Sequence, residues 1–211
     1  MVGGWCSVND GQVLQRCFFM RIIAGKWRSR RLNRPSANTT RPMPDRVKEA
    51  VFSLLGSRFA TPGRLPPIRI ADMFAGGGTM GLEALSRGAA SCVFFEQDRD
   101  AVVVLRRNLR EIGVGDEASI VVGDAWKSAI TSDDGLAFDL VILDPPYSDS
   151  EDTTPTGRVW RFLTALVNSD RDRPLVLLHH QAALPFEEQS ESPWCIVDRR
   201  TFGTSGITVF S

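Results

Sequence analysis

The stretch "DPPY", Asp144 to Tyr147, places a carboxylate, two prolines and an aromatic ring directly after the apolar run "FDLVIL". Proline lacks a backbone N–H and cannot continue a central strand, so a buried strand must end here in a stiff loop. Asp144 and a carbonyl of Pro145 or Pro146 can accept hydrogen bonds from an exocyclic amine while Tyr147 stacks on its base. Because such an amine is a weak nucleophile, acceptors that orient it and stabilise charge growing on nitrogen would catalyse its methylation.

A second motif, "ADMFAGGGTMGLEAL", has Gly76, Gly78 and Gly81 in G-x-G-x-x-G spacing between an expected strand and an expected helix. Glu96 ends the next expected strand 20 residues after Gly76. This spacing is typical of dinucleotide binding, in which the glycines admit a ligand and the acid accepts ribose hydroxyls. A tight strand-to-helix turn that binds no ligand is the alternative.

Two further acids distinguish between nucleotide cofactors. Asp72 stands four residues before Gly76, at an expected strand end, and Asp124 follows the third expected strand in "VVGDA". A carboxylate is unfavourable beside a pyrophosphate and favourable near the ammonium and sulfonium charges of S-adenosylmethionine. Asp124 would meet the adenine edge if the ribose lies on Glu96, and a helix N-cap role for Asp124 is compatible with this. The pattern therefore favours S-adenosylmethionine over a dinucleotide.

The elements that must position these residues begin at Ile68, where short apolar runs start to alternate with helical stretches. Strands apolar on both faces and separated by helices predict βαβ units and a parallel, doubly wound sheet whose loops converge on one crevice. We expect strands at 68–74, 92–96, 118–123, 138–143 and 174–180, helices at 81–88, 99–113 and 157–169, short helices after 123 and at 183–189, and a closing antiparallel hairpin from 194–202 and 206–210 at the sheet edge.

The N-terminal third differs in character. "RIIAGKWRSRRL" predicts a hairpin with Gly25 at its turn, and "PDRVKEAVFSLLGSRF" predicts an amphipathic helix that opens at Pro44 and runs into Gly56. A Pro/Gly linker follows at 60–67. We therefore divide the chain into three segments. Residues 1–19 are a disordered extension or a misassigned start, residues 20–67 are a small basic module, and residues 68–211 are the main α/β domain.

Positive charge is concentrated in that module. The whole chain has a formal charge of zero, yet nine basic residues and one acid lie between Arg21 and Lys48, a net charge of +8 that leaves −8 on the remainder. Such an excess predicts a docking site for a polyanion, and a solvated arm is the alternative. The candidate RNA contacts are Arg21, Lys26, Trp27, Arg28, Arg30, Arg31 and Arg41.

Metal and membrane functions have little support in the sequence. The four cysteines lack C-x-x-C spacing and are expected to be free thiols, and no nearby Cys or His completes a metal site with His179 and His180, which we interpret as structural. No apolar stretch approaches the roughly 20 residues needed to cross a bilayer, and no secretion signal is apparent. We expect a cytoplasmic protein.

Together these motifs resemble the bacterial RsmD family, the guanine-N2 methyltransferases of 16S ribosomal RNA. The resemblance runs from Met20 nearly to the end of the chain, through "MRIIAGKWRSRRL", "TRPMPDRVKEAVFSLL", "DMFAGGGTMGLEALSRGA", "FFEQD", "FDLVILDPPY" and "RTFGTSGITVF". The first two stretches are the specific ones, since the glycine loop and DPPY occur in many amino-methylating enzymes. The resemblance implies a class I methyltransferase: a Rossmann-like, doubly wound sheet of seven strands, the last antiparallel, with S-adenosylmethionine as methyl donor.

The resemblance also implies roles by position. The loop that binds the methionine part would consist of Asp72, Phe74, Ala75, Gly76, Gly78 and Thr79. The ribose would be held by Glu96 and Gln97, and the adenine by Asp124 and Ala125. The target amine would be held by the loop from Asp144 to Tyr147. The implied partner is 16S rRNA, in which the target is one guanine of a hairpin loop. The rRNA would lie within an assembled or partly assembled small subunit, and the enzyme would act as a monomer. Two departures are the loop "GGGTMG", where the family more often has "GSGALG", and the acidic stretch 148–157, a candidate flap over the base.

Three alternatives stay open. A DNA or RNA adenine-N6 methyltransferase shares the fold and loop, but one that reads duplex DNA usually needs a separate recognition domain of about 50 residues or more, for which the chain has no room. An inactive nucleic-acid-binding protein with this fold is disfavoured by the intact acids Asp72, Glu96, Asp124 and Asp144. An NAD-dependent oxidoreductase would leave DPPY unexplained, and no Tyr-x-x-x-Lys motif is present.

Overall fold

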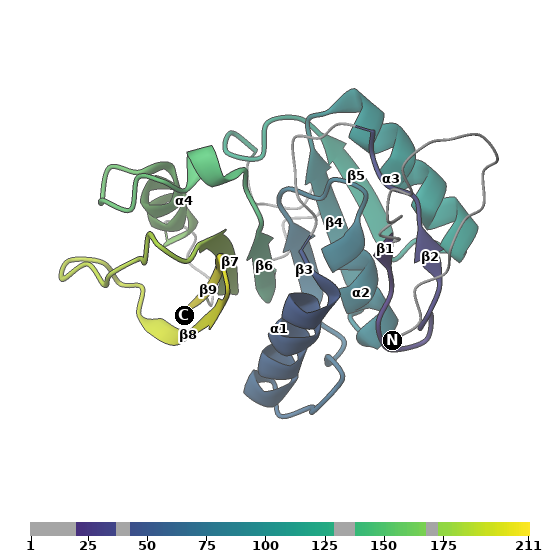
Figure 1. The fold of residues 1–211 in the computed structure, drawn as a ribbon, viewed down its shortest axis with the longest axis horizontal. Helices are drawn as coiled ribbons and strands as arrows, with labels where there is room; N and C mark the ends of the chain where they lie inside the picture. Colours follow the sequence, from purple (N-terminus) through teal and green to yellow (C-terminus); the bar gives the residue numbers. More distant parts are fainter. Residues whose placement is uncertain (1–19, 37–42, 129–137, 168–172) are drawn as a thin grey trace, which may run out of the picture.

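A computed structural model of the chain describes residues 20–36, 43–128, 138–167 and 173–211 (Figure 1). Its centre is a seven-stranded sheet with the strand order β5-β4-β3-β6-β7-β9-β8, and a separate two-stranded sheet pairs β1 with β2. The strands are β1 (Met20–Arg21), β2 (Arg31–Leu32), β3 (Arg69–Asp72), β4 (Ser91–Glu96), β5 (Ala118–Val122), β6 (Leu140–Leu143), β7 (Leu175–Gln181), β8 (Ile196–Phe202) and β9 (Ser205–Phe210). The helices are α1 (Asp45–Arg58), α2 (Thr79–Arg87), α3 (Arg99–Ile112) and α4 (Arg158–Val167), and Tyr147–Asp149 forms a 3-10 turn.

The sheet has the topology expected from the sequence. Strands β5, β4, β3, β6 and β7 run parallel to one another, and β9 runs antiparallel between β7 and β8. β6 lies directly beside β3, with Asp72 opposite Ile142. Every residue of β6 is buried, as expected for a central parallel strand covered on both faces. The loops that follow β3 and β6 therefore leave the sheet side by side.

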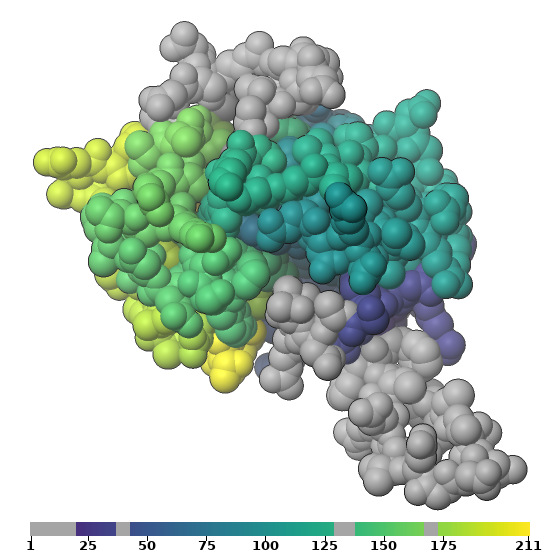
Figure 2. Space-filling view, turned by 90° about the horizontal axis from the view of Figure 1, so that it is seen from above, coloured from purple at the N-terminus to yellow at the C-terminus, as the bar shows by residue number. Residues whose placement is uncertain are grey.

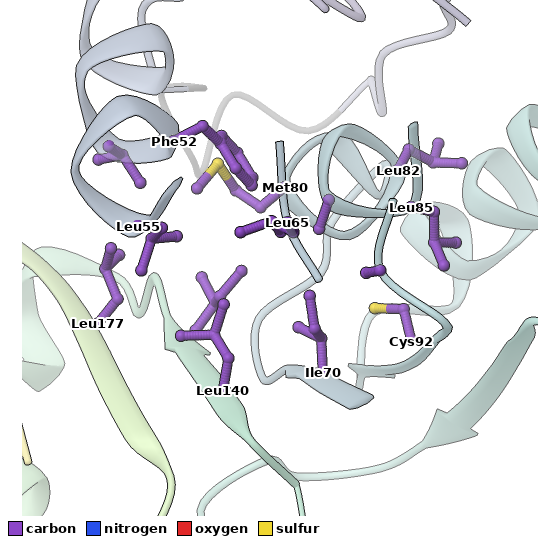
Figure 3. Packing of buried hydrophobic residues seen from close by; sticks show 14 of the residues in the cluster. Phe52, Leu55, Leu65, Ile70, Met80, Leu82, Leu85, Cys92, Leu140 and Leu177 are labelled. Carbon is purple, nitrogen blue, oxygen red and sulfur yellow. The ribbon is translucent and has the colours of Figure 1, made fainter. Parts of the chain in front are cut away.

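Two hydrophobic clusters cover the two faces of the sheet. Helices α1, α2 and α3 pack on one face, and α4 packs on the other with the residues that precede β8. Figure 3 shows Phe52 of α1 beside Met80 of α2, and Leu55 of α1 on the side of the helix that faces Leu177 of β7 and Leu140 of β6. Phe52 and Leu55 are fully buried, which is worth about 1.5–3 kcal/mol for each side chain. α1 is therefore part of the main core, although it lies in the basic N-terminal section of the chain.

The expected N-terminal hairpin forms and is docked on α2. The carboxylate of Glu83, which is fully buried, accepts the backbone N–H groups of Ile23 at 2.7 Å and Ala24 at 3.0 Å. At the turn, Gly25 has a φ of +82° and a Cβ there would lie 1.8 Å from the carbonyl oxygen of Ser86. Only glycine permits this approach, so the hairpin has a fixed seat on the helix that begins at the glycine loop.

Some local expectations were wrong. Residues 183–189 form no helix: a turn ends at residue 183, residues 185–189 have no regular secondary structure, and the chain path there buries Phe186 against the rings of His180 and Phe210, whose centroids lie 5.2 and 6.4 Å away. α1 continues through Gly56 to Arg58, and Pro44 is its N-cap residue. Residues 125–127 form a turn where a short helix was expected to begin, and the segment 129–137 lies outside the described residues, as do residues 1–19.

Candidate active site

The glycine loop joins β3 to α2 and requires unusual backbone geometry. Gly78 is the N-cap of α2 with a φ of +85°, and a Cβ there would lie 2.5 Å from the Cδ1 of Leu105. Gly76 has a φ of +53° with no atom within 4 Å of where its Cβ would lie. The loop is thus closely packed on the α3 side and open at Gly76, a shape that leaves backbone accessible to a ligand.

Asp72 lies beneath this loop. It is 1% exposed, and its Oδ2 accepts the N–H of Gly81 at 2.9 Å, which fixes the first turn of α2. Burial raises the pKa of Asp72 to about 7, because a buried carboxylate loses its hydration; the Gly81 hydrogen bond opposes this rise, and the negative charges of Asp144 and Glu96 add to it. Three of the predicted acids are therefore close enough to influence one another, and the site has a negative potential.

Glu96 connects the glycine loop to α3. Its Oε2 accepts the N–H of Gly76 at 2.7 Å and its Oε1 accepts the N–H of Asp98 at 2.8 Å. Asp98 in turn caps α3 by accepting the N–H groups of Asp100 and Ala101. Each carboxylate oxygen of Glu96 keeps a further lone pair, so it can also accept ribose hydroxyls. Gln97, exposed on the surface, follows it in the chain.

Asp124 and Phe74 are brought together by a residue that the sequence reasoning missed, Trp126. Asp124 accepts the backbone N–H of Trp126 at 3.0 Å, the capping role considered for it. The indole ring lies 5.0 Å from the ring of Phe74, between centroids, and its Nε1–H donates to Asp149 at 2.9 Å. Trp126 thus joins the loops after β3, β5 and β6, and its position two residues after Asp124 was the available signal. Of the other predicted cofactor contacts, Ala75 and Ala125 are buried and Thr79 opens α2.

The DPPY loop leaves β6 beside β7. The side chain of Asp144 is 25% exposed, and its Oδ1 lies 2.7 Å from the Nδ1 of His179 on β7. The ring of Tyr147, which is 38% exposed, meets the imidazole edge-to-face with centroids 5.7 Å apart. Pro145 is buried and Pro146 is partly buried between them. His179, interpreted from sequence as a structural residue, therefore contacts both ends of the predicted catalytic loop.

The predicted RNA contacts gather on the hairpin and its flanks. Figure 2 shows this segment, in purple, against the teal part of the chain. Arg28 and Arg31 are exposed, Arg21 pairs with Asp45 at 2.9 Å, and Arg30 donates to the carbonyl oxygen of Glu111.

The ammonium of Lys26 lies 4.1 Å from the ring centroid of Trp27 and 3.3 Å from Glu117. Lys48, counted in the basic excess, is instead buried and donates to the carbonyl oxygen of Arg21, and burial lowers its pKa. It is not available to a polyanion. Arg41 lies outside the described residues.

Comparison with known proteins gives the chain its relatives. A family model described as "Conserved hypothetical protein 95" matches residues 20–211. The chain belongs to this family, the RsmD family. YlbH of Bacillus subtilis is 34% identical over 197 residues, 90% of this chain and 98% of that protein. Ribosomal RNA small subunit methyltransferase D of Haemophilus influenzae is 32% identical over 167 residues, 74% of this chain and 82% of that protein.

The solved structure of the Escherichia coli protein yhhF superposes with a TM-score of 0.70 at 27% identity, covering 91% of this chain and 97% of that one. The expected RsmD membership and class I methyltransferase fold are therefore confirmed, and S-adenosylmethionine is the cofactor of this fold family. In the described part of the chain, no group of three His, Cys, Asp or Glu side chains could hold a metal ion, and no helix is long and apolar enough to span a membrane.

Proposed function

We propose that this protein transfers a methyl group from S-adenosylmethionine to the exocyclic N2 amine of a guanine in 16S ribosomal RNA. The observation that carries the proposal is the meeting of the glycine loop, the strand-end acids and the DPPY loop at the carboxyl ends of β3, β4 and β6. The name of the Haemophilus relative, ribosomal RNA small subunit methyltransferase D, supports ribosomal RNA as the substrate.

The residues fit a cationic nucleoside cofactor. The open backbone at Gly76 can admit the methionine part, Glu96 can accept the ribose hydroxyls, and Asp124 with Trp126 borders the adenine position. Burial is the main cause of the raised pKa of Asp72, and the negative charges of Asp144 and Glu96 add to it; a sulfonium and an ammonium would offset those negative charges. When bound, S-adenosylmethionine supplies a methyl group attached to a positively charged sulfur, and this sulfur becomes a neutral thioether when the methyl group is transferred.

Asp144 prepares the acceptor nitrogen. Its Oδ1 is engaged by His179, so Oδ2 remains for one N–H of the target amine, and the carbonyl of Pro145 or Pro146 can accept the other. These two acceptors direct the nitrogen lone pair away from the ring and stabilise the positive charge that develops as the new N–C bond forms. One N–H proton then passes to Asp144 Oδ2 and on to water, which leaves a neutral secondary amine. Tyr147, partly exposed, is available to stack on the base.

The hairpin supplies the attachment to RNA. It is held on α2 by Glu83 and Ser86, so its arginines keep a fixed position relative to the glycine loop at the start of the same helix. We propose that residues 20–67 act as this RNA-binding module and residues 68–211 as the catalytic domain of a monomer. A rigid basic surface suits an RNA already held in shape by an assembled or partly assembled subunit.

The test uses labelled S-adenosylmethionine with purified 16S rRNA and with partly assembled small subunits in parallel, followed by digestion and mass spectrometry of the nucleosides. The expected product is N2-methylguanosine, absent with the Asp144→Ala variant. N6-methyladenosine would overturn the guanine assignment and establish the adenine-N6 alternative. Failure of S-adenosylmethionine to raise the melting temperature, together with no product on either RNA, would overturn the proposed activity, and retained binding of RNA by that protein would establish the inactive RNA-binding alternative.

A further inference from the structure

His179 lies between the two functional ends of the DPPY loop. Leu143 of β6 is paired with Leu178 of β7, so the next residues, Asp144 and His179, emerge together at the ends of the paired segment. The imidazole Nδ1 lies 2.7 Å from Asp144 Oδ1, and its ring packs edge-to-face on Tyr147. His179 is only 4% exposed, so water does not compete strongly for these contacts.

The hydrogen bond defines the tautomer of His179. An ionised carboxylate can only accept, so the Nδ1 of His179 must carry the proton and donate it to Asp144. The Nε2 atom is buried and has no hydrogen-bond partner among the described residues. In the Nδ1–H tautomer this atom is a bare lone pair, whereas in the other tautomer a buried N–H would be left without an acceptor. Both observations favour the same tautomer.

The neighbouring His180 has a different role. It points to the opposite face of β7, where its Nε2 lies 2.9 Å from Thr208 Oγ1 and its ring packs on Phe186. The two histidines share a strand, burial and chemistry, but only His179 reaches the DPPY loop. His180 is therefore a matched control within the same chain.

From this geometry we infer that His179 is a positioning residue for methyl transfer, and the inference rests on the proposed role of Asp144. By binding Oδ1, His179 fixes the rotation of the carboxylate and leaves Oδ2 directed to the target amine. The same N–H offsets the repulsion that Asp144 experiences from the nearby carboxyl of Asp72. The imidazole also supports the ring of Tyr147, so one side chain sets both the acceptor and the stacking surface. Nothing in the sequence motif itself assigns this role to β7.

The first test measures the tautomer and needs no substrate. The chain has two histidines, so long-range nitrogen–proton NMR of protein labelled with 15N-histidine gives two separable ring patterns. We expect His179 in the Nδ1–H form, and we expect Asp144→Ala to abolish that preference. An Nε2–H pattern for His179 in the unsubstituted protein would overturn the inference.

The second test separates positioning from folding. His179→Leu removes the donor, and His179→Asn keeps an N–H near the position of Nδ1. In His179→Leu we expect kcat with RNA to fall about 100-fold, which is the effect of misplacing a reacting group by approximately 1 Å. In His179→Asn we expect kcat to recover to within about fivefold of that of the unsubstituted protein. In both His179 variants the affinity for S-adenosylmethionine and the KM for RNA should change less than about threefold. In His180→Asn, kcat should also change less than about threefold.

Equal kcat values for His179→Leu and His179→Asn would overturn the inference, as would a loss confined to KM or an equal loss in His180→Asn. A comparison with Asp144→Ala separates the two proposals. If Asp144→Ala is inactive while His179→Leu is fully active, the positioning role fails and the proposed function stands. If Asp144→Ala is fully active, the role of Asp144 fails. In the Asp144→Ala background, His179→Leu should have little further effect, because its partner is already absent.

Discussion

The buried carboxyl of Asp72 should make the stability of this protein fall as pH rises. Burial is the main cause that raises its pKa from 3.8 to about 7. Between these values the folded state holds a proton that the unfolded state has lost, so the free energy of unfolding decreases from about pH 4 to pH 7 and then levels off. A difference of about three pKa units, at about 1.4 kcal/mol for each unit, gives a contribution of about 4 kcal/mol.

The measurement is urea unfolding of the ligand-free protein and of Asp72→Asn at several pH values from 4.5 to 8. Asparagine does not titrate and its side-chain oxygen can still accept the Gly81 N–H, so the Asp72 contribution appears as the difference between the two curves. We expect the unsubstituted protein to lose most of about 4 kcal/mol relative to the variant over this range. Asp139→Asn is the matched control, because it removes an exposed aspartate that also accepts a backbone N–H, that of Arg69. A difference between protein and Asp72→Asn that does not vary with pH would refute the reasoning.

Three further predictions concern ligands and catalysis. Because a cationic ligand favours the ionised form of Asp72, affinity for S-adenosylmethionine should rise from pH 6 to pH 8, and binding should release a proton. Calorimetry in two buffers of different ionisation enthalpy measures the proton release, which Asp72→Asn should abolish. Asp144→Ala should lower the methylation rate about 100-fold or more and leave the Kd for S-adenosylmethionine nearly unchanged, as for removal of one preorganised hydrogen-bond acceptor from the transition state. Replacing Arg28, Arg30 and Arg31 by alanine should weaken binding to single-stranded RNA and reduce its log–log salt slope by about 0.7 for each phosphate that is no longer neutralised.

Each of these has an outcome that contradicts it. A pH-independent affinity would place the cofactor's charges away from Asp72, and unchanged turnover in Asp144→Ala would remove that residue from catalysis. For the arginines, Arg200→Ala is the control, because Arg200 lies on the edge strand β8 at the other side of the sheet and pairs with Asp198. If the triple variant and Arg200→Ala give the same salt slope, the hairpin does not contact phosphates.

The sequence by itself determined the order of the strands and helices, the hairpin, the glycine loop and the acids at the strand ends. These follow from local patterns: β6 is a short run that is apolar on both faces, as in a covered parallel strand, and Gly78 stands at a strand-to-helix turn where φ is +85°. Periodicity and special backbone angles depend on residues near in the chain, so they can be read before any tertiary contact is known. The expected helix at 183–189 failed because the burial of Phe186, a tertiary effect, decided the path of that segment.

Only the tertiary structure decided which side chains meet across elements. His179 and Asp144 are 35 residues apart, and Glu83 accepts an N–H from Ile23 across 60 residues. Such pairs depend on strand register and on the seating of one element on another, which residue spacing does not encode. The same reason removed Lys48 from the basic surface: its charge was visible in the sequence, but its burial against the carbonyl of Arg21 was set by the packing of α1 on the core.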